Sequence, residues 1–348
     1  MNTSRREKTG LHQITMGITF TGCGAAIAPQ SLSNGELGKL VETSDEWIQT
    51  RTGIKERTLC PPEQSLAQLA AQAGEKAIAM AGLTPTDLDL ILLATSTPDD
   101  LFGTAPQVQG LLGATRAVAF DVTAVCSGFV FAVITAAQFM RSGLYRRVLV
   151  IGGDILSRWV DWSDRTTCVL FGDGAGAVVL EANPTQDQLL AFDLYTDGTL
   201  NSALNLSFQG ERRSLLEDKA VSQGTYQPIT MNGREVYRFA VAKVPEVIEK
   251  VLFQADLPVT AIDWLILHQA NQRIMEAVAE RLGIPPEKVV SHLDKYGNTS
   301  AASIPLALDA AVRSGQIQPG DLIATSGFGA GLSWGAALFR WGRSISSP

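Results

Sequence analysis

The chain has 348 residues, of which 45% are hydrophobic and 18% are charged, so it has the composition of a globular protein with material for a large core. The formal net charge is −7 and no block of lysine and arginine stands out, which argues against nucleic acid as the main partner. This length predicts two domains or two closely joined halves.

The cysteines and the N-terminus indicate the cellular setting. The four cysteines form no CxxC pair and there are only three histidines, which disfavours a zinc site or a disulfide framework and fits a reducing compartment. The polar segment 1–15 lacks the apolar core of a signal peptide, and no apolar stretch is long enough to span a membrane. We therefore expect a cytoplasmic protein with no membrane partner and a flexible N-terminal extension over 1–16.

Short β-rich runs alternate with helical segments through the first half of the chain. The run 88–96 is continuously apolar, as in a strand covered on both faces. An Ala-rich periodic segment predicts a helix over 65–82, and the mostly apolar 127–143 predicts a buried helix. Further strands are expected over 18–27, 117–125, 147–154 and 174–181. This alternation predicts an α/β fold in which helices cover a sheet.

The second half repeats the pattern of the first. An amphipathic helix over 241–257 precedes a segment, 260–271, that resembles 86–97. Two more pairs of segments match in the same order. Segment 289–315 resembles 118–143, and segment 328–339 resembles 171–180. A long-period duplication explains three matches in one order. We therefore expect two related halves, residues 17–190 and 191–348, packed with approximate two-fold symmetry.

The duplication predicts where chemistry would gather. Cys126 lies 15 residues before Arg141, and Asn298 lies 15 residues before Arg313, so the two would occupy equivalent strand-to-helix elbows. His268 follows a strand equivalent to 90–94. The three side chains are therefore expected to meet in one cleft between the halves.

Each of these residues also has a purely structural interpretation. A random cysteine is usually buried and inert, and we interpret Cys23, Cys60 and Cys168 in that way. Cys126 differs because it starts a helix, whose dipole favours the thiolate. His268 taken alone would be a core histidine, but a polar strand exit, Gln269 to Asn271, follows it.

The remaining candidates are weaker. Asn298 could simply cap the helix after it, and His292 is assigned a structural role inside an expected strand. The glycine-rich runs 172–177 and 327–335 do not fit a phosphate-binding GxGxxG at a strand-to-helix turn, because each leads into a strand. Tight hairpins and close backbone packing are the better interpretation of these glycines.

Taken together, AVCSGF, HQAN and GNTSAAS resemble the condensing enzymes of fatty-acid synthesis, and most closely the β-ketoacyl-acyl carrier protein synthase III family. The resemblance covers residues 17–342 and includes four further motifs. These are TSDEWIQTRTGI (43–54), DRTTCVLFGDGAGA (164–177), MNGREVYRFAV (231–241) and FGAGLSWG (328–335). The Cys-His-Asn set is specific, since related synthases and thiolases carry different triads or a second catalytic cysteine.

The resemblance implies a thiolase-like fold of five layers, αβαβα, in a homodimer. It implies that Cys126 takes an acyl group from acyl-CoA, typically acetyl, and that malonyl on acyl carrier protein then loses CO₂. The resulting enolate would attack the acyl-cysteine, and no metal or redox cofactor is needed. Decarboxylation builds charge on the malonyl thioester oxygen, which His268 and Asn298 can stabilise by donating hydrogen bonds.

The resemblance implies further roles for residues at matching positions. The backbone N–H groups of Cys126 and of the 328–331 loop, including Gly329, would form a second oxyanion hole, and Phe328 would exclude water. Phe102 would lend its ring to the acyl pocket of the partner subunit. The coenzyme A tunnel maps onto Trp47, Arg51, Arg165, Gly233 and Asn271, with the adenine between Trp47 and Arg51. A basic patch for the acidic carrier protein maps onto Arg234, Arg238, Arg273 and Arg281, interrupted by Glu280.

Some positions depart from the family pattern. Val125 stands where alanine is frequent, Ala330 where glycine is frequent, and the segment 101–107 is one residue shorter than in some relatives. Three alternatives stay open at this point. They are a relative with the same triad but another starter or acceptor in secondary metabolism, a cysteine hydrolase, and a coenzyme A or carrier-binding module that has lost catalysis.

Overall fold

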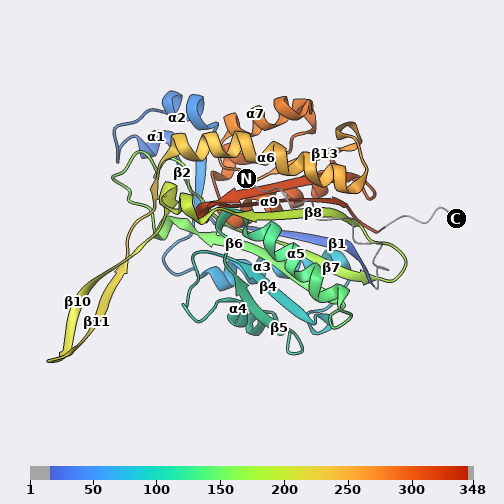
Figure 1. Ribbon diagram of the computed structural model, residues 1–348, viewed down its shortest axis with the longest axis horizontal. Helices are drawn as coiled ribbons and strands as arrows, with labels where there is room; N and C mark the ends of the chain where they lie inside the picture. Colours follow the sequence, from blue (N-terminus) through green and yellow to red (C-terminus); the bar gives the residue numbers. More distant parts are fainter. Residues whose placement is uncertain (1–15, 344–348) are drawn as a thin grey trace, which may run out of the picture.

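The computed structural model describes residues 16–343 (Figure 1). The extension expected over 1–16 therefore lies, apart from Met16, outside the described residues, and so do residues 344–348. Among residues 16–343, no helix is both long and apolar enough to cross a membrane.

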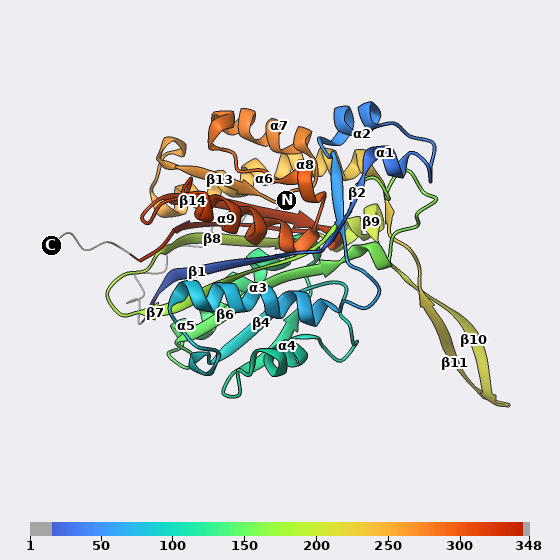
Figure 2. The same ribbon diagram turned by 180° about the vertical axis from the view of Figure 1, so that it is seen from behind.

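The first sheet has five strands in the order β1-β7-β6-β4-β5. Strands β4, β5 and β6 run parallel, while β7 is antiparallel to both β6 and β1. The sheet is flanked by α3 and α4 on one face and by α5 on the other (Figures 1 and 2). The bounds are β1 Gly17–Ile27, β4 Leu90–Ala94, β5 Val118–Val122, β6 Arg147–Ile155, β7 Asp173–Asn183, α3 Leu66–Ala81, α4 Ala105–Leu112 and α5 Gly128–Arg141.

The second sheet has four strands, and their order repeats that of the first sheet. Strand β13 is parallel to β14, and β15 is antiparallel to both β14 and β8. The order β13-β14-β15-β8 thus corresponds to β4-β6-β7-β1 in the first sheet. The bounds are β8 Leu189–Thr196, β13 Trp264–Leu267, β14 Leu322–Gly329 and β15 Ser333–Arg340. Because β8 starts at Leu189, a boundary between residues 190 and 191 would cut this strand.

The counterpart of β5 in the second half is reduced to one parallel bridge between Val289 and Leu265. The prediction that His292 lies in a strand is therefore wrong. The Gln269 side chain accepts the backbone N–H of His292 at 3.2 Å, which a strand would use for its ladder. His292 instead precedes the short helix α8, Leu293–Tyr296.

Helices and sheets alternate in five layers, which confirms the predicted αβαβα architecture. Helices α5 and α9 (Ser303–Arg313) form the central layer: α9 packs on β1 and β7, and α5 contacts strands of both sheets. Helix α6 (Gly233–Ala255) covers the second sheet and packs against α7 (Gln272–Leu282) (Figure 1). Helix α6 begins eight residues before the predicted 241, because the Asn232 side chain caps it by accepting the N–H of Glu235.

The glycine run 172–177 forms no hairpin, contrary to our prediction, but lies mostly within β7. Its glycines allow close packing instead. A Cβ at Gly176 would lie 2.8 Å from the backbone nitrogen of Leu306 in α9. The second run does connect the antiparallel pair β14 and β15, as predicted.

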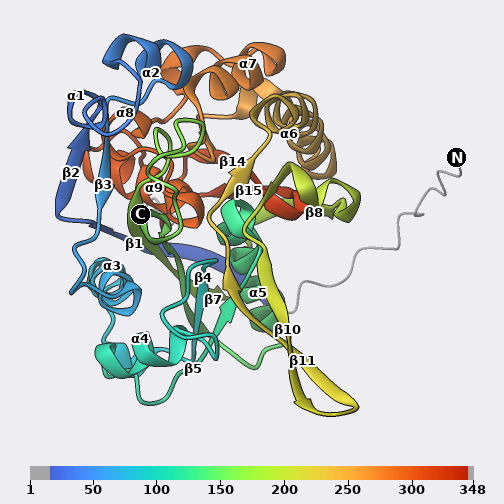
Figure 3. The ribbon, with the colours of Figure 1, turned by 90° about the vertical axis from the view of Figure 1, so that its left-hand side faces the viewer.

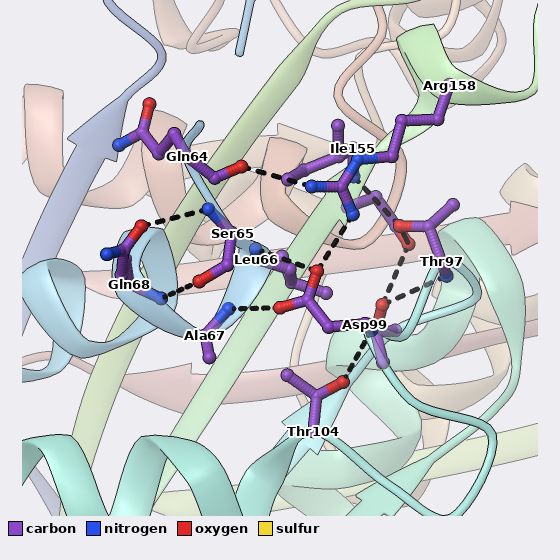
Figure 4. A network of polar contacts seen from close by, with 12 residues as sticks. Gln64, Ser65, Leu66, Ala67, Gln68, Thr97, Asp99, Thr104, Ile155 and Arg158 are labelled. Carbon is purple, nitrogen blue, oxygen red and sulfur yellow. Dashed lines mark hydrogen bonds and ion pairs between the residues drawn. The ribbon is translucent and has the colours of Figure 1, made fainter. Parts of the chain in front are cut away.

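A carboxylate anchors the loop that carries Phe102. Asp99 accepts the backbone N–H groups of Leu66 and Ala67 at the start of α3, and it pairs with Arg158 at 2.8 Å (Figure 4). The Asp99 N–H donates to the Thr104 hydroxyl at 2.8 Å. The two ends of the loop are therefore joined to the body, while the Phe102 side chain is 98% exposed.

A hairpin that the sequence did not reveal extends from the body. Strands β10 (Phe208–Leu216) and β11 (Lys219–Tyr226) pair with each other and point away from the layers (Figure 3). All residues of both strands are exposed. The other small elements are α1 Asn34–Leu37, α2 Asp45–Thr52, β2 Gln30–Ser33, β3 Glu56–Leu59, β9 Leu204–Asn205 and β12 Thr230–Met231.

Candidate active site

Cys126 lies in a tight 3-10 turn between β5 and α5. The residue before it, Val125, has a φ of 47°, a left-handed conformation that β-branched residues rarely adopt. This turn directs the sulfur into a cavity of about 530 Å³, and Cys126 is 4% exposed. Val125 itself, where alanine is frequent in the family, does not line the cavity.

The end of β14 touches the turn that carries Cys126 through two glycines. A Cβ at Gly329 would lie 2.8 Å from the backbone nitrogen of Cys126, and one at Gly327 would lie 2.8 Å from the Cα of Ser127. Only glycine permits this approach. The backbone of the second half is thereby held beside the Cys126 N–H, where a thioester oxygen would need its donors.

Burial dominates the acidity of Cys126. It raises the pKa of the thiol to about 12, while the nearby Ser300 hydroxyl acts in the opposite direction. Desolvation therefore disfavours the thiolate that was predicted at this position, and α5 begins only at Gly128, two residues after Cys126.

His268 follows β13 directly. Its backbone N–H donates to Ser326 of β14 at 2.9 Å, and its Nδ1 lies 2.8 Å from the Ser303 hydroxyl. The Phe328 ring lies 5.3 Å from the imidazole in an edge arrangement. Burial lowers the pKa of His268 to about 3, so the ring is neutral at physiological pH.

Asn298 is held by a parallel bridge to the backbone segment 170–172. Its N–H donates to Leu170 and its carbonyl accepts from Gly172, at 2.9 and 3.0 Å. The side-chain oxygen accepts the Ser300 N–H at 2.9 Å, so the side chain closes the turn before α9. Because its oxygen is occupied there, the amide NH₂ remains as a donor for the cavity that Asn298 lines.

The two elbows are related, but with a different residue equivalence from the predicted one. Ser300 has a φ of 50°, like Val125, and each begins a three-residue 3-10 turn that leads into a central helix. This geometry pairs Cys126 with Ala301, not with Asn298. Asn298 comes before the elbow in its own half. The equal spacings from Cys126 to Arg141 and from Asn298 to Arg313 concealed this shift, because α9 is shorter than α5.

One cavity brings together almost all of the predicted site residues. Its lining includes Cys126, His268, Asn298, Phe328 and Gly329, and also Trp47, Arg51, Arg165, Gly233 and Asn271. The guanidinium carbons of Arg51 and Arg165 lie 4.8 and 5.0 Å from the Trp47 ring centre. The Asn271 side chain donates to the backbone oxygen of Arg51 at 2.9 Å.

Positive charge gathers at this cavity although the chain is acidic overall. The described residues that line it include five arginines, Arg51, Arg165, Arg234, Arg238 and Arg273, and no aspartate or glutamate. Arg281, the fourth residue of the predicted carrier patch, does not line the cavity and instead donates to backbone oxygens of α6. The cavity is therefore suited to an anionic ligand.

Comparison with known proteins gives the family. Family models described as 3-oxoacyl-[acyl-carrier-protein] synthase III and its C-terminal part match residues 120–198 and 252–341. The chain is 66% identical over 331 residues to the β-ketoacyl-[acyl-carrier-protein] synthase III of Synechocystis sp., which covers 95% of this chain and 100% of that protein. The chain belongs to the β-ketoacyl-acyl carrier protein synthase III family. It is a condensing acyltransferase that initiates fatty-acid synthesis.

Solved structures share this fold over more than nine-tenths of the chain. The 3-oxoacyl-[acyl-carrier-protein] synthase III from Aquifex aeolicus has 44% identity and a TM-score of 0.85, covering 93% of this chain and 100% of that one. The priming β-ketosynthase from the R1128 polyketide pathway has 33% identity and a TM-score of 0.86, covering 96% and 99%.

Two serines that contact the site were given no role from the sequence. Ser300 and Ser303 lie within the GNTSAAS motif and touch Asn298 and His268. A usable signal was present for Ser303, because it is a buried polar residue at the start of α9, where the next five residues are apolar.

The contact between Gly329 and Cys126 predicts the effect of one methyl group. Replacing Gly329 with alanine should lower the rate of Cys126 acylation by roughly 100-fold or more, because the new Cβ displaces a backbone oxyanion donor. Gly110→Ala is the matched control, since Gly110 lies in α4 with open space around it and should acylate normally. Single-turnover acylation of both variants at wild-type rates would contradict the role of this contact.

The neutral state of His268 predicts a pH effect on stability. Its folded pKa lies below its unfolded value, so stability is complete above about pH 6.5 and falls as pH drops toward the folded pKa. Between pH 6 and 4 the unfolding free energy of wild type should fall more steeply than that of His268→Gln, by up to about 1.4 kcal/mol per pH unit. Urea unfolding of both proteins measures this difference in slope. Both proteins retain His292, so its contribution to the pH dependence cancels in the comparison. Equal slopes would show that His268 is not buried as a neutral ring.

Proposed function

We propose that the chain condenses an acyl group from acyl-CoA, acetyl in the first instance, with malonyl-acyl carrier protein through an acyl-Cys126 intermediate. The observation that carries this proposal is the single cavity, which holds a thiol, two neutral hydrogen-bond donors and a ring of arginines. The reaction needs no metal or redox cofactor, because decarboxylation itself supplies the carbon nucleophile.

The first half-reaction is a thioester exchange. The Cys126 sulfur attacks the acyl carbonyl carbon, the bond from that carbon to the coenzyme A sulfur breaks, and the thiol proton ends on the coenzyme A sulfur. The backbone N–H of Cys126 and the adjoining Gly329 segment lie where the tetrahedral oxyanion would form. Phe328, 4% exposed at the cavity wall, keeps water from the acyl-cysteine.

The second half-reaction starts when malonyl-carrier loses CO₂. The two electrons of the broken carbon–carbon bond enter the thioester, which becomes an enolate with its charge on oxygen. The imidazole of His268 and the amide of Asn298 donate to that oxygen. Both donors are neutral, so they gain strength from charge that develops only during the reaction. The enolate carbon then attacks acyl-Cys126, and the cysteine sulfur leaves and recovers a proton.

The outer part of the cavity fits coenzyme A. The adenine would stack on Trp47, where two arginine side chains now lie within stacking distance. One of them must swing aside to admit the base, and Arg165 is tethered to the Glu42 backbone oxygen at 2.8 Å. Arg51 would therefore move and close over the adenine. The remaining arginines favour the phosphates.

The same mouth would receive the carrier protein. Arg234 and Arg238 lie in the first turns of α6, and Arg273 lies at the start of α7, with its guanidinium 5.9 Å from the Tyr237 ring. Three fixed cations around an entrance would steer an acidic protein toward it. Arg281 lies too far along α7 to belong to this group.

We also propose a homodimer in the cytoplasm. Strand β5 is an edge of the first sheet, and the nearby Leu101 and Phe102 are 79% and 98% exposed. An open strand edge beside large exposed apolar side chains suits pairing with a second copy, which would receive Phe102 in its acyl pocket. The cysteines, all unpaired, suit a reducing compartment.

A panel of acyl-CoAs tests this proposal. Intact-protein mass spectrometry should show one acyl adduct on wild type with acetyl-CoA and no adduct on Cys126→Ala. The matched controls Cys23→Ala and Cys60→Ala should still carry the adduct. The acylated protein should then release CO₂ from malonyl-carrier and form a 3-oxoacyl-carrier. If no acyl-CoA labels Cys126, the synthase mechanism is wrong. Labelling only by longer or branched acyl groups would instead assign the chain to a different starter.

A further inference from the structure

A buried polar cluster surrounds the Nδ1 nitrogen of His268. The Ser303 hydroxyl lies 2.8 Å from this nitrogen and 3.3 Å from the backbone nitrogen of Gln269. Ser303 is 0% exposed and Gln269 is likewise 0% exposed. The hydroxyl therefore has to satisfy its hydrogen bonds within the protein.

The donors and acceptors can be arranged in only one fully satisfied way. The Gln269 N–H can only donate, so the Ser303 oxygen accepts from it. Within residues 16–343, the only other hydrogen-bond partner of that hydroxyl is Nδ1 of His268. If Nδ1 carried the ring proton, the oxygen would accept twice and its own proton would be buried without an acceptor, which is strongly unfavourable.

We infer that Ser303 is a positioning residue that fixes the tautomer of His268. The hydroxyl donates to Nδ1, so the ring proton is on Nε2. In the described part of the chain Nε2 has no hydrogen-bond partner, and His268 lines the cavity. The ring therefore offers the cavity a hydrogen-bond donor, as the enolate step of the proposed function requires. The role assigned to Ser303 rests on the proposed function, whereas the tautomer of His268 can be measured independently of it.

The backbone around Ser303 holds the hydroxyl in register. The Ser303 carbonyl accepts from Nε2 of His292 at 2.9 Å, and Gln269 Oε1 accepts the His292 N–H at 3.2 Å. Gln269 Nε2 donates to the Leu267 carbonyl at 2.7 Å, which ties the cluster to β13. Removing only the Ser303 hydroxyl leaves these contacts in place, so Ser303→Ala isolates its effect on His268.

The test uses ¹⁵N-histidine labelling of the full chain, which is practical because the sequence has only three histidines, with His12 outside the described residues. Protonated and unprotonated ring nitrogens have well separated ¹⁵N shifts, and His268→Gln assigns the signals. Wild type should show His268 as the neutral tautomer with Nε2 protonated. Ser303→Ala should shift the Nδ1 resonance and populate the other tautomer, while Ser303→Thr, which keeps a hydroxyl, should restore the wild-type pattern.

The kinetic readout separates positioning from general damage. In Ser303→Ala, kcat for condensation should fall by about tenfold or more, approaching the effect of removing one oxyanion donor. The rate of Cys126 acylation should stay unchanged. Ser314→Ala, at the other end of α9, is the control, because its hydroxyl binds only the Ala311 carbonyl at 3.0 Å.

Two results would overturn the inference. One is a wild-type spectrum with Nδ1 protonated, and the other is a Ser303→Ala spectrum in which the His268 tautomer is unchanged. A protein with the expected tautomer and the expected response to Ser303→Ala, but no condensation with any acyl-CoA, would support the inference and contradict the proposed function.

Discussion

The site depends on one steric constraint, which is the contact between the end of β14 and the turn that carries Cys126. The two halves contribute different groups, so nothing in either half alone can align them. Glycines at 327 and 329 let the backbone of the second half reach the nucleophile turn without an intervening side chain. Because β14 also pairs with β13, this contact fixes the position of His268 relative to the sulfur. Phe328 lies between the two glycines and faces the imidazole.

The second organising feature is that the side chains proposed for catalysis are neutral and buried. Desolvation lowers the pKa of His268 and raises that of Cys126, which removes charge from both before substrate arrives. An amide and a neutral imidazole suit a reaction in which negative charge appears only on the substrate. The charged groups of the cavity are arginines at its mouth, where phosphates and an acidic partner would bind. The groups proposed to bind are thus charged, and the groups proposed for the chemistry are neutral, within one cavity.

Much of this arrangement could be predicted from the sequence. The repeated hydrophobic pattern predicted an α/β fold in two related halves, because strand and helix periodicity survive duplication, and the family resemblance added the five layers. The family motifs placed Cys126, His268, Asn298 and most of the tunnel residues correctly in one cavity. The predictions that were wrong concern residues whose local surroundings override the sequence pattern. The backbone N–H of His292 donates to the Gln269 side chain instead of to a strand partner, and desolvation disfavours the thiolate at Cys126. The glycines of β7 were interpreted as a turn because the helix packed against them is distant in sequence.

The central claim is a division of labour, in which the backbone beside Cys126 serves acyl transfer while His268 and Asn298 serve decarboxylation. The most direct measurement compares the two half-reactions in His268→Ala and Asn298→Ala under single-turnover conditions. Release of CO₂ from malonyl-carrier should fall by roughly 100-fold or more, while acylation of Cys126 by acyl-CoA stays within about tenfold of wild type. Equal loss of both half-reactions in the two variants would contradict the account.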